Sequence, residues 1–413
     1  MLTPAMLGAA NTITPPAGGG FPAIPALDLI LYAGSSWQTE INNAGVGANI
    51  GFASGVYNGF NVTLLANQKL WPATENASIV FNGNGTSRAM YGSKLNGVQM
   101  DFRRAGVPSG FTPHPDGDLC GAAHFTNYQG SFYLGIISNL LSGNWYDDGL
   151  NTAGWVANGW KVRGIYMTNV GTHCVTLCGD DAELTDFHFT GHPSGRRMEI
   201  GYKMLYGHDQ IVKYGRNHQA RPTNWENEGG GCKNWGTHRL LQEDIISYDH
   251  VGPAFWNDNR NFNSTWRRLE AYSCTGAGIF DEINVNAFGP EPSGENLIEY
   301  CNIHDGIGTD PPSFGIWQRS GPGIHIVNSG FTRVRYNTVT NCPVGIGFLD
   351  QIRIDQAGET CTNQSAGRVE FNTLDDATVS GAQRDHTVGG SPYSNLTSVT
   401  WASNTYINGS TGP

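Results

Sequence analysis

"HVGPAFWNDN", residues 250–259, and "CTGAGIFDEI", residues 274–283, align at a constant offset of 274 − 250 = 24 residues. Gly252 falls on Gly276, and Trp256 falls on Phe280. A strand-like piece precedes each segment, "RLLQEDIISYD" before the first and "WRRLEAYS" before the second. A unit of about two dozen residues cannot bury an apolar face alone and must stack on its neighbours. The pair therefore predicts stacked coils of short strands.

The same sequence pattern recurs downstream with longer offsets, in "NLIEYCNIHDGIG" and "FTRVRYNTVTNCPVGIG". There Gly306 and Gly345 are expected to take the place of Gly278. Insertions such as "GTDPPSFGIWQRSGPG" account for the longer offsets, because a coil absorbs extra residues at its corners. The alignment also predicts an inward polar ladder of four residues near a turn: His250, Cys274, Asn302 and Asn341.

These phrases resemble the right-handed parallel β-helix of the pectate-lyase-like superfamily. The stretch from about 225 to 285 is similar to a group of bacterial and phage β-helix repeat proteins with "GG-x-K-x-W", "GP-x-x-W-x-D" and "GIF-x-EI" on successive coils. The resemblance implies an all-β chain that forms a single right-handed parallel β-helix. We expect an N-terminal extended arm at residues 1–45, the β-helix at 46–405 and a tail at 406–413.

Composition agrees with strands and limits the partners. Gly accounts for 56 of 413 residues and charged residues for only 14%, unlike a helical protein. The chain carries 24 basic and 35 acidic residues, a net charge of −11, and no basic run that could follow phosphates. Nucleic acid is therefore not an expected partner, and an acidic polymer would need a local Arg or Lys patch.

The ends and the cysteines leave alternatives open. No Lys or Arg precedes Lys69, so either the protein has no export signal of its own or a signal has been removed. No stretch is long enough to span a membrane. The eight cysteines show no CxxC pair and no zinc spacing, which favours buried thiols but leaves disulfides open.

The repeat register predicts a catalytic cluster. When the 24-residue register is extended back by one coil, one column contains Lys233, Asn257 and Asp281. The next column contains Asn234, Asp258 and Glu282. Adjacent coils lie about 4.8 Å apart. If Asp258 and Glu282 both point outward, their mutual repulsion raises one pKa, so that one carboxyl acts as an acid and the other as a base or nucleophile. Glycoside hydrolysis uses such a pair.

Other residues are predicted to complete this site. Lys233 would neutralise an intermediate or a substrate carboxylate, and Asp281 would join the catalytic set. Tryptophan faces stack on sugar rings at wet binding sites, and the charged insertion at 208–228 could supply further contacts. The expected substrate-binding residues are Trp225, Trp235, Trp256, Asn257, His218 and Arg221.

Two other interpretations compete with the carbohydrate site. Stacked Asp, Asn and Glu side chains at coil corners often form purely structural ladders, with Lys233 in a structural salt bridge. Alternatively, Asp258, Asp281 and Glu282 supply the hard oxygens of a calcium site, although no D-x-D-x-D spacing supports it. No other metal and no cofactor are expected. The segment "GTHCVTLCGDD", which contains His173, is expected to form part of a buried ladder of side chains.

Three functions remain open at this point. The first is a phage virion spike or tail protein that binds and cleaves a bacterial surface polysaccharide, attached to other virion proteins through its N-terminal arm. The second is a secreted polysaccharide lyase or glycoside hydrolase. The third is a non-catalytic structural or adhesion β-helix. The expected location is a phage tail or the extracellular space. The resemblance to phage spike proteins, which are often trimeric, implies a possible homotrimer.

Overall fold

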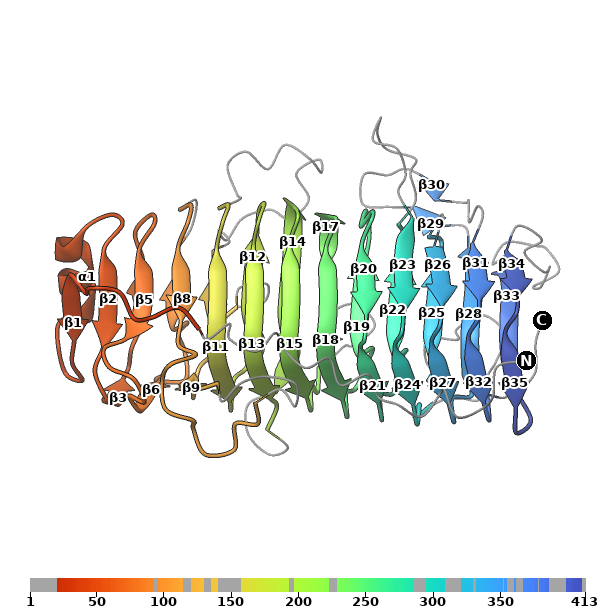
Figure 1. The fold of residues 1–413 in the computed structure, drawn as a ribbon, viewed down its shortest axis with the longest axis horizontal. Helices are drawn as coiled ribbons and strands as arrows, with labels where there is room; N and C mark the ends of the chain where they lie inside the picture. The colour runs from red at the N-terminus through yellow and green to blue at the C-terminus, as the bar shows by residue number, and fades with distance from the viewer. Residues whose placement is uncertain are drawn as a thin grey trace.

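The computed structural model describes residues 21–92, 95–113, 120–129, 135–139, 157–192, 197–222, 229–284, 295–308, 321–329, 332–351, 353–354, 360–361, 367–377, 379–385 and 399–410. Their strands stack side by side in chain order into one elongated coil, red at one end and blue at the other (Figure 1). The one helix in these residues is α1, Trp37–Ala44, which packs against β1 and β4 at the red end. No helix within the described ranges is long and apolar enough to cross a membrane.

The largest sheet, sheet A, is formed by parallel pairs between successive coils. Its strands are β1 (Leu29–Leu31), β2 (Asn49–Phe52), β3 (Gly55–Asn58), β5 (Lys69–Pro72), β6 (Ile79–Asn82), β8 (Gln99–Asp101), β9 (Ala123–Thr126), β11 (Lys161–Thr168), β13 (Glu183–Thr190), β15 (Ile211–His218), β18 (Leu241–Tyr248), β20 (Thr265–Arg267), β21 (Glu270–Tyr272), β23 (Asn296–Glu299), β24 (Asn302–His304), β26 (Thr332–Arg335), β27 (Thr338–Thr340), β31 (Arg368–Glu370), β32 (Thr373–Asp375), β34 (Thr400–Ala402) and β35 (Thr405–Ile407).

Two further parallel sheets continue each other along a second face of the coil, joined by a bridge between Asn234 and Asn257. Sheet B holds β4 (Val62–Thr63), β7 (Met90–Tyr91), β10 (Ile137–Ser138), β12 (Thr172–Cys178), β14 (Met198–His208), β16 (Gly230–Cys232) and β17 (Trp235–His238). Sheet D holds β19 (Phe255–Asp258), β22 (Ile279–Glu282), β25 (Ile324–Val327), β28 (Val344–Gln351) and β33 (Val379–Asp385). An antiparallel pair, β29 (Arg353–Ile354) and β30 (Thr360–Cys361), lies apart from them.

From β13 to β27, each coil bends within sheet A at a single residue in the left-handed region. These bend residues succeed one another along the coil: Asp186 (φ 54), Tyr214 (φ 54), Asp244 (φ 56), Arg268 (φ 52), Tyr300 (φ 56) and Tyr336 (φ 55). Positive φ strains residues other than glycine, so the stacking of neighbouring coils must offset a recurrent local cost. The bend divides each of these coils into two strand halves.

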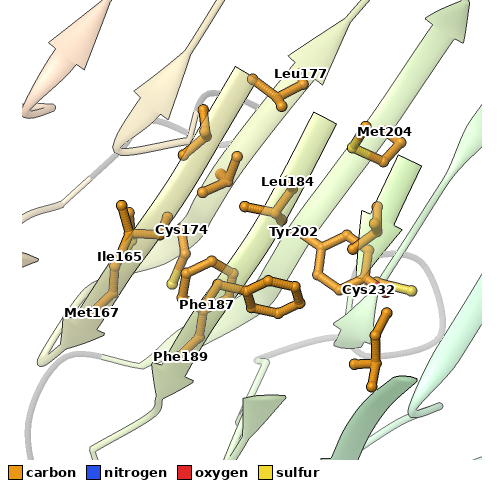
Figure 2. Packing of buried hydrophobic residues seen from close by; sticks show 14 of the residues in the cluster. Ile165, Met167, Cys174, Leu177, Leu184, Phe187, Phe189, Tyr202, Met204 and Cys232 are labelled. Carbon is orange, nitrogen blue, oxygen red and sulfur yellow. The ribbon is translucent and has the colours of Figure 1, made fainter. Parts of the chain in front are cut away.

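The interior is filled by side chains from both faces of the coil. Figure 2 shows Phe187 and Phe189 of β13 beside Tyr202 of β14. The Phe187 ring lies 4.8 Å from that of Phe189 and 5.6 Å from that of Tyr202, centroid to centroid. Because strand residues alternate between faces, every second residue enters this core and the others face outward.

The observed register confirms part of the repeat alignment and corrects the rest. Phe255 pairs with Ile279, as the offset of 24 predicts. The next partner is Ile324 followed by Ile346, so the residues that continue the position of Gly278 are Gly323 and Gly345. The prediction for Gly306 was wrong, because it follows β24 in sheet A rather than preceding a strand of sheet D.

The predicted polar ladder is correspondingly wrong in its second half. Pairing of Tyr248 with Tyr272, then with His304 and Thr340, places four residues in one column: His250, Cys274, Gly306 and Cys342. The expected Asn302 and Asn341 lie elsewhere in the coil. Asn302 is a paired residue of β24, and Asn341 is one position before the column.

The ends of the chain and the cysteines complete the fold. β1, within the segment expected as an arm, already pairs with β2, so the coil includes residues before 46. β35 extends the coil to Ile407 through its pairing with β32. The cysteines whose side chains are described are free, buried thiols: Cys120, Cys174, Cys178, Cys232, Cys274, Cys301 and Cys342.

Candidate active site on the outer face of sheets B and D

Strands β19 and β22 carry two kinds of side chain. Phe255 and Ile279 belong to the central core. Trp256 and Phe280, the next residues, belong to a separate apolar cluster with Val327, as alternation along a strand requires. The rings of Trp256 and Phe280 stack at 5.3 Å. This second cluster defines the outer face of sheets B and D.

Lys233 brings a charge onto this outer face. Its Nζ lies 3.0 Å from Oδ2 of Asp258 and 3.8 Å from the centroid of the Trp256 ring. Only 6% of the Lys233 side chain and 14% of the Asp258 side chain are exposed. The ammonium is therefore held between a carboxylate and a π face, which both stabilise a cation withdrawn from water.

The glycine run before Lys233 allows the chain to reach this position. Gly230 has φ +119, and a Cβ on it would lie 2.0 Å from the backbone oxygen of Pro253 on the next coil. No other residue fits such a close approach without displacing the backbone. The run thus sets the path of the chain directly before the lysine.

Glu282 lies next to Asp258 on this face. The two residues are register partners on β19 and β22, as the sequence predicts. Oε2 of Glu282 accepts a hydrogen bond of 3.0 Å from Nε1 of Trp256, and the residue is buried. Trp256 therefore contacts both Lys233, through its ring face, and Glu282, through its ring nitrogen.

Lys203 is a member of this cluster that the sequence did not reveal. Tyr202 pairs with Cys232, so the two lysines that follow them are also neighbours on adjacent coils. Lys203 is buried, although its neighbour Tyr202 belongs to the core. Alternation therefore places Lys203 on the outer face, one coil before Lys233.

His173 lies close to the two lysines. It is fully buried, and burial lowers the pKa of its imidazole well below the usual value, with the charges of Lys203 and Lys233 adding to the effect. The ring is therefore neutral near pH 7. Burial of His173 agrees with the prediction, but its proximity to two lysines relates it to the cluster rather than to an inert ladder.

Asp281 and Asn257 face the interior instead. The Asp281 carboxylate accepts hydrogen bonds from Asn284, Asn296 and Thr332, at 2.8 Å for the Thr332 hydroxyl. Asn234 donates to Oδ1 of Asn257 at 2.9 Å. Asn234 rather than Lys233 is the bridge partner of Asn257, an offset of 257 − 234 = 23, so the predicted column containing Lys233 and Asn257 was wrong.

This inward orientation excludes the proposed calcium ligand set. Asp281 lies on the interior side of β22, while Asp258 and Glu282 lie on the outer face with Trp256. Three carboxylates on two sides of a sheet cannot converge on one ion. The described residues contain no group of three or more His, Cys, Asp or Glu side chains that could hold a metal ion.

The remaining predicted binding residues differ in position, and Trp235 lies two residues after Lys233 on the same face of the strand. Trp235 packs with Cys178 and Leu205 and is buried. His218 belongs to β15 in sheet A. Arg221 bonds the backbone and carboxylate of Asp249, the latter at 2.6 Å. Trp225 lies outside the described residues.

The cluster combines groups for two chemical tasks. Asp258 and Glu282 on adjacent strands provide two carboxyl groups at the spacing of neighbouring coils, about 4.8 Å between backbones. Lys203 and Lys233 provide positive charge to bind or stabilise an anion. Few charged residues are buried in proteins without a partner or a function. The arrangement could support acid and base chemistry on a substrate with anionic groups.

Comparison with known proteins shows the fold. No protein-family model and no curated protein matches the sequence. The PL6 family alginate lyase AlyGC superimposes with a TM-score of 0.53 and 12% identity over 91% of this chain and 51% of that chain, so this chain spans about half its length. The A-module of the Azotobacter vinelandii mannuronan C-5 epimerase AlgE4 gives 0.46 and 12% identity over 90% and 89%. A polygalacturonase from Erwinia carotovora ssp. carotovora gives 0.45 and 11% over 92% and 97%.

The stacked parallel sheets and the alginate lyase superposition define the class as a right-handed parallel β-helix. More particularly, this is the fold that the repeated segments of the sequence indicated. Because one fold serves many reactions, the chemistry must be argued from the residues of this chain.

Proposed function

We propose that this protein binds a polysaccharide on the outer face of sheets B and D and cleaves it there, with Asp258 and Glu282 as the acid and base pair. The observation that carries the proposal is the position of Lys233, buried between Asp258 and the ring of Trp256, which in turn bonds Glu282. The alginate lyase with this fold acts, by its name, on a polysaccharide, which supports the substrate class.

Hydrolysis is the reaction that the carboxyl pair supports best. One carboxyl group protonates the departing sugar oxygen, and the other attacks the anomeric carbon or activates a water molecule. Lys203 and Lys233 bind carboxylates of an acidic sugar, which offsets the long-range repulsion expected from a net charge of −11. Acidic polysaccharides are therefore the first substrates to test.

The lysine pair favours a second candidate reaction, lyase cleavage of a uronate. Two neighbouring cations would neutralise the uronate carboxylate, which makes the adjacent C–H bond more acidic. A base then takes that proton, and the glycosidic oxygen leaves with its bonding electrons, so that a carbon–carbon double bond forms. Hydrolysis forms no such double bond, so the ultraviolet absorbance of the products separates the two reactions.

The test is depolymerisation of a panel of neutral and uronate-containing polysaccharides by wild-type protein, Asp258→Asn and Glu282→Gln. Loss of general acid or base function lowers the rate by about 10²- to 10⁴-fold. Glu270→Gln is the matched control, because Glu270 is a partly exposed carboxylate on sheet A that bonds His304. Equal rates in wild type and both site variants would show that Asp258 and Glu282 are not the catalytic pair.

For the location, the proposal is a spike or tail protein on a phage virion, with secretion as the alternative. The support is the segment "TPPAGGGFPAIPA", whose Pro and Gly content suits an attachment arm. Mass spectrometry of purified phage particles would detect the protein if it is a virion component. Sedimentation of the intact protein would test the homotrimer suggested by resemblance to spikes.

A further inference from the structure

A second polar cluster lies on the outer face of sheet A, on strands that pair with one another. It consists of His124, Tyr166, His188 and His218, from β9, β11, β13 and β15. Phe111, from the segment between β8 and β9, packs at 5.9 Å from the Tyr166 ring and 6.1 Å from the His188 ring. The proposed cleavage site on sheets B and D uses none of these residues.

Hydrogen bonds fix the proton positions on the two central histidines. The backbone N–H of Thr112 donates to Nδ1 of His188, so the neutral His188 ring carries its proton on Nε2. That Nε2 lies 3.1 Å from Nε2 of His218. Two N–H groups cannot point at each other at this distance, so we assign Nε2 of His218 as an acceptor, with its proton on Nδ1. The Thr190 hydroxyl, 3.0 Å from the same Nε2, donates to it in this arrangement.

This assignment leaves one buried donor without an acceptor. Nδ1 of His218 is buried and has no hydrogen-bond partner among the described residues. The His218 ring cannot easily turn away, because it stacks on Tyr248 at 4.7 Å with 3° between the planes. An unsatisfied buried N–H is unfavourable, and a bound acceptor would supply the missing hydrogen bond.

Arg216 provides a second unsatisfied donor on the same strand face. It stands two residues before His218 on β15. Its Nε is buried, and in the described parts of the chain it has neither a hydrogen bond nor an ion pair. The nearby carboxylate of Asp249 is already bonded to Arg221 at 2.6 Å. A guanidinium with no counterion among the described residues, beside a buried N–H, is a binding arrangement for an anion.

The same hydrogen bonds argue against a metal between the two histidines. A metal on Nε2 of His188 would require the proton on Nδ1, where it would face the N–H of Thr112. An oxygen anion needs no such change, because Nε of Arg216 and, in this tautomer, Nδ1 of His218 are donors.

We infer that Arg216 and His218 form a second carbohydrate-binding site that takes the carboxylate of an acidic sugar. Nε of Arg216 and Nδ1 of His218 donate to its oxygens, and both side chains are partly exposed at the surface. The identification of the ligand as a sugar rests on the proposed function. The site itself is independent of the catalytic pair.

The experiment follows the His218 ring nitrogens by nuclear magnetic resonance in protein carrying nitrogen-labelled histidine, during titration with glucuronate and, separately, with inorganic phosphate. His218→Phe assigns the signal, since it removes the donor and keeps a ring to stack on Tyr248. Glucuronate is expected to shift the His218 signal. Arg216→Gln is expected to weaken this binding by about tenfold, the value of one charge-assisted hydrogen bond.

Arg239→Gln is the control, because Arg239 is an arginine already bonded to Asp209. It should bind glucuronate as the wild type does. Asp258→Asn should also leave the His218 response unchanged, so a failed cleavage proposal would not remove this result. The inference is overturned if glucuronate leaves the His218 signal unmoved, if Arg216→Gln binds with unchanged affinity, or if only phosphate binds.

Discussion

The β-helix carries two sets of charged residues that differ in how positive and negative side chains are arranged along the coils. On sheet A, one outward column follows the strand register with alternating signs: Lys213, Glu243, Arg267, Glu299, Arg335 and Glu370. On sheet B, the adjacent Lys203 and Lys233 have the same sign and are followed on sheet D by aromatic Trp256. The sheet A column alternates in sign along its whole length, whereas the cluster on sheets B and D places two buried lysines on adjacent strands, with Asp258 paired to Lys233.

The distances support this difference. Glu243 is within 2.6 Å of Lys213, Arg267 and Arg268, so several cations share one carboxylate. Redundant ion pairs of this kind connect one coil to the next and need no ligand. Buried clusters that place like charges on neighbouring strands are common at functional sites. The contrast predicts that equivalent substitutions have unequal effects in the two regions.

The largest stability effect is expected for Lys233→Met. It leaves the Asp258 carboxylate mostly buried without this cation, and breaking a buried pair costs about 3–5 kcal/mol. Lys213→Met is the matched control, because Glu243 keeps two arginines. Urea denaturation of both variants measures the difference in unfolding free energy. Equal losses would mean that the two regions do not differ as described.

A pH-dependent effect is expected from Asp281. Burial raises the pKa of its carboxyl to about 6, although hydrogen bonds from Thr332, Asn284 and Asn296 act in the opposite direction. The folded protein therefore binds this proton more tightly than the unfolded chain. Stability from this group is fully present below about pH 4 and declines as the pH rises to about 6, by about 3 kcal/mol in total.

Asp281→Asn removes this titration and keeps the size of the side chain. Unfolding free energies of wild type and variant, measured between pH 4 and pH 7, should differ in their slope. The wild type is expected to lose stability relative to the variant as the pH rises. Parallel curves would contradict the assignment of a raised pKa to this interior carboxyl.

A smaller effect with the opposite pH dependence is expected from Glu243. Burial alone would raise the pKa of its carboxyl, but Lys213 and the two arginines outweigh burial and lower it. Glu243→Gln should cost about 2 kcal/mol at pH 7, because charge-assisted hydrogen bonds are lost. The wild-type advantage is present above the unfolded pKa and is lost as the pH falls through the lowered folded pKa. Glycan cleavage should not change, since Glu243 is on sheet A.

The sequence predicted which residues are neighbours on adjacent coils only where those coils have equal length. The offset of 24 correctly paired Asp258 with Glu282, because no insertion separates β19 from β22 beyond the ordinary corner. Lys203 escaped notice because it precedes Lys233 by 233 − 203 = 30 residues, across a longer turn. The predicted register before β19 was also wrong by one residue, because Asn234 rather than Lys233 is the bridge partner of Asn257. Since side chains alternate along a strand, this shift places Asn257 on the opposite face from Lys233.

The repeat pattern also did not predict contacts between segments that the alignment does not relate. The sequence placed Arg216 and His218 in a charged insertion and His218 among the binding residues of the predicted site. Instead, β15 is a regular strand whose outward side chains meet His188 of the previous coil. Thr112, more than 70 residues before His188, fixes the proton on that ring. Such contacts depend on how the coils stack, and a linear repeat does not encode which loop covers which strand.

The smallest effect is expected where a pair is matched but exposed. Arg239 and Asp209 bond at 2.7 Å, with 49% and 54% of their side chains exposed. Water already solvates both charges, so Arg239→Gln should change the unfolding free energy by less than about 0.5 kcal/mol. Thermal denaturation of this variant beside Glu243→Gln tests whether burial or pairing decides stability. If the exposed pair proved as costly to break as the buried one, then pairing alone would stabilise the coil, and burial of Lys233 would no longer distinguish a functional cluster from a structural one.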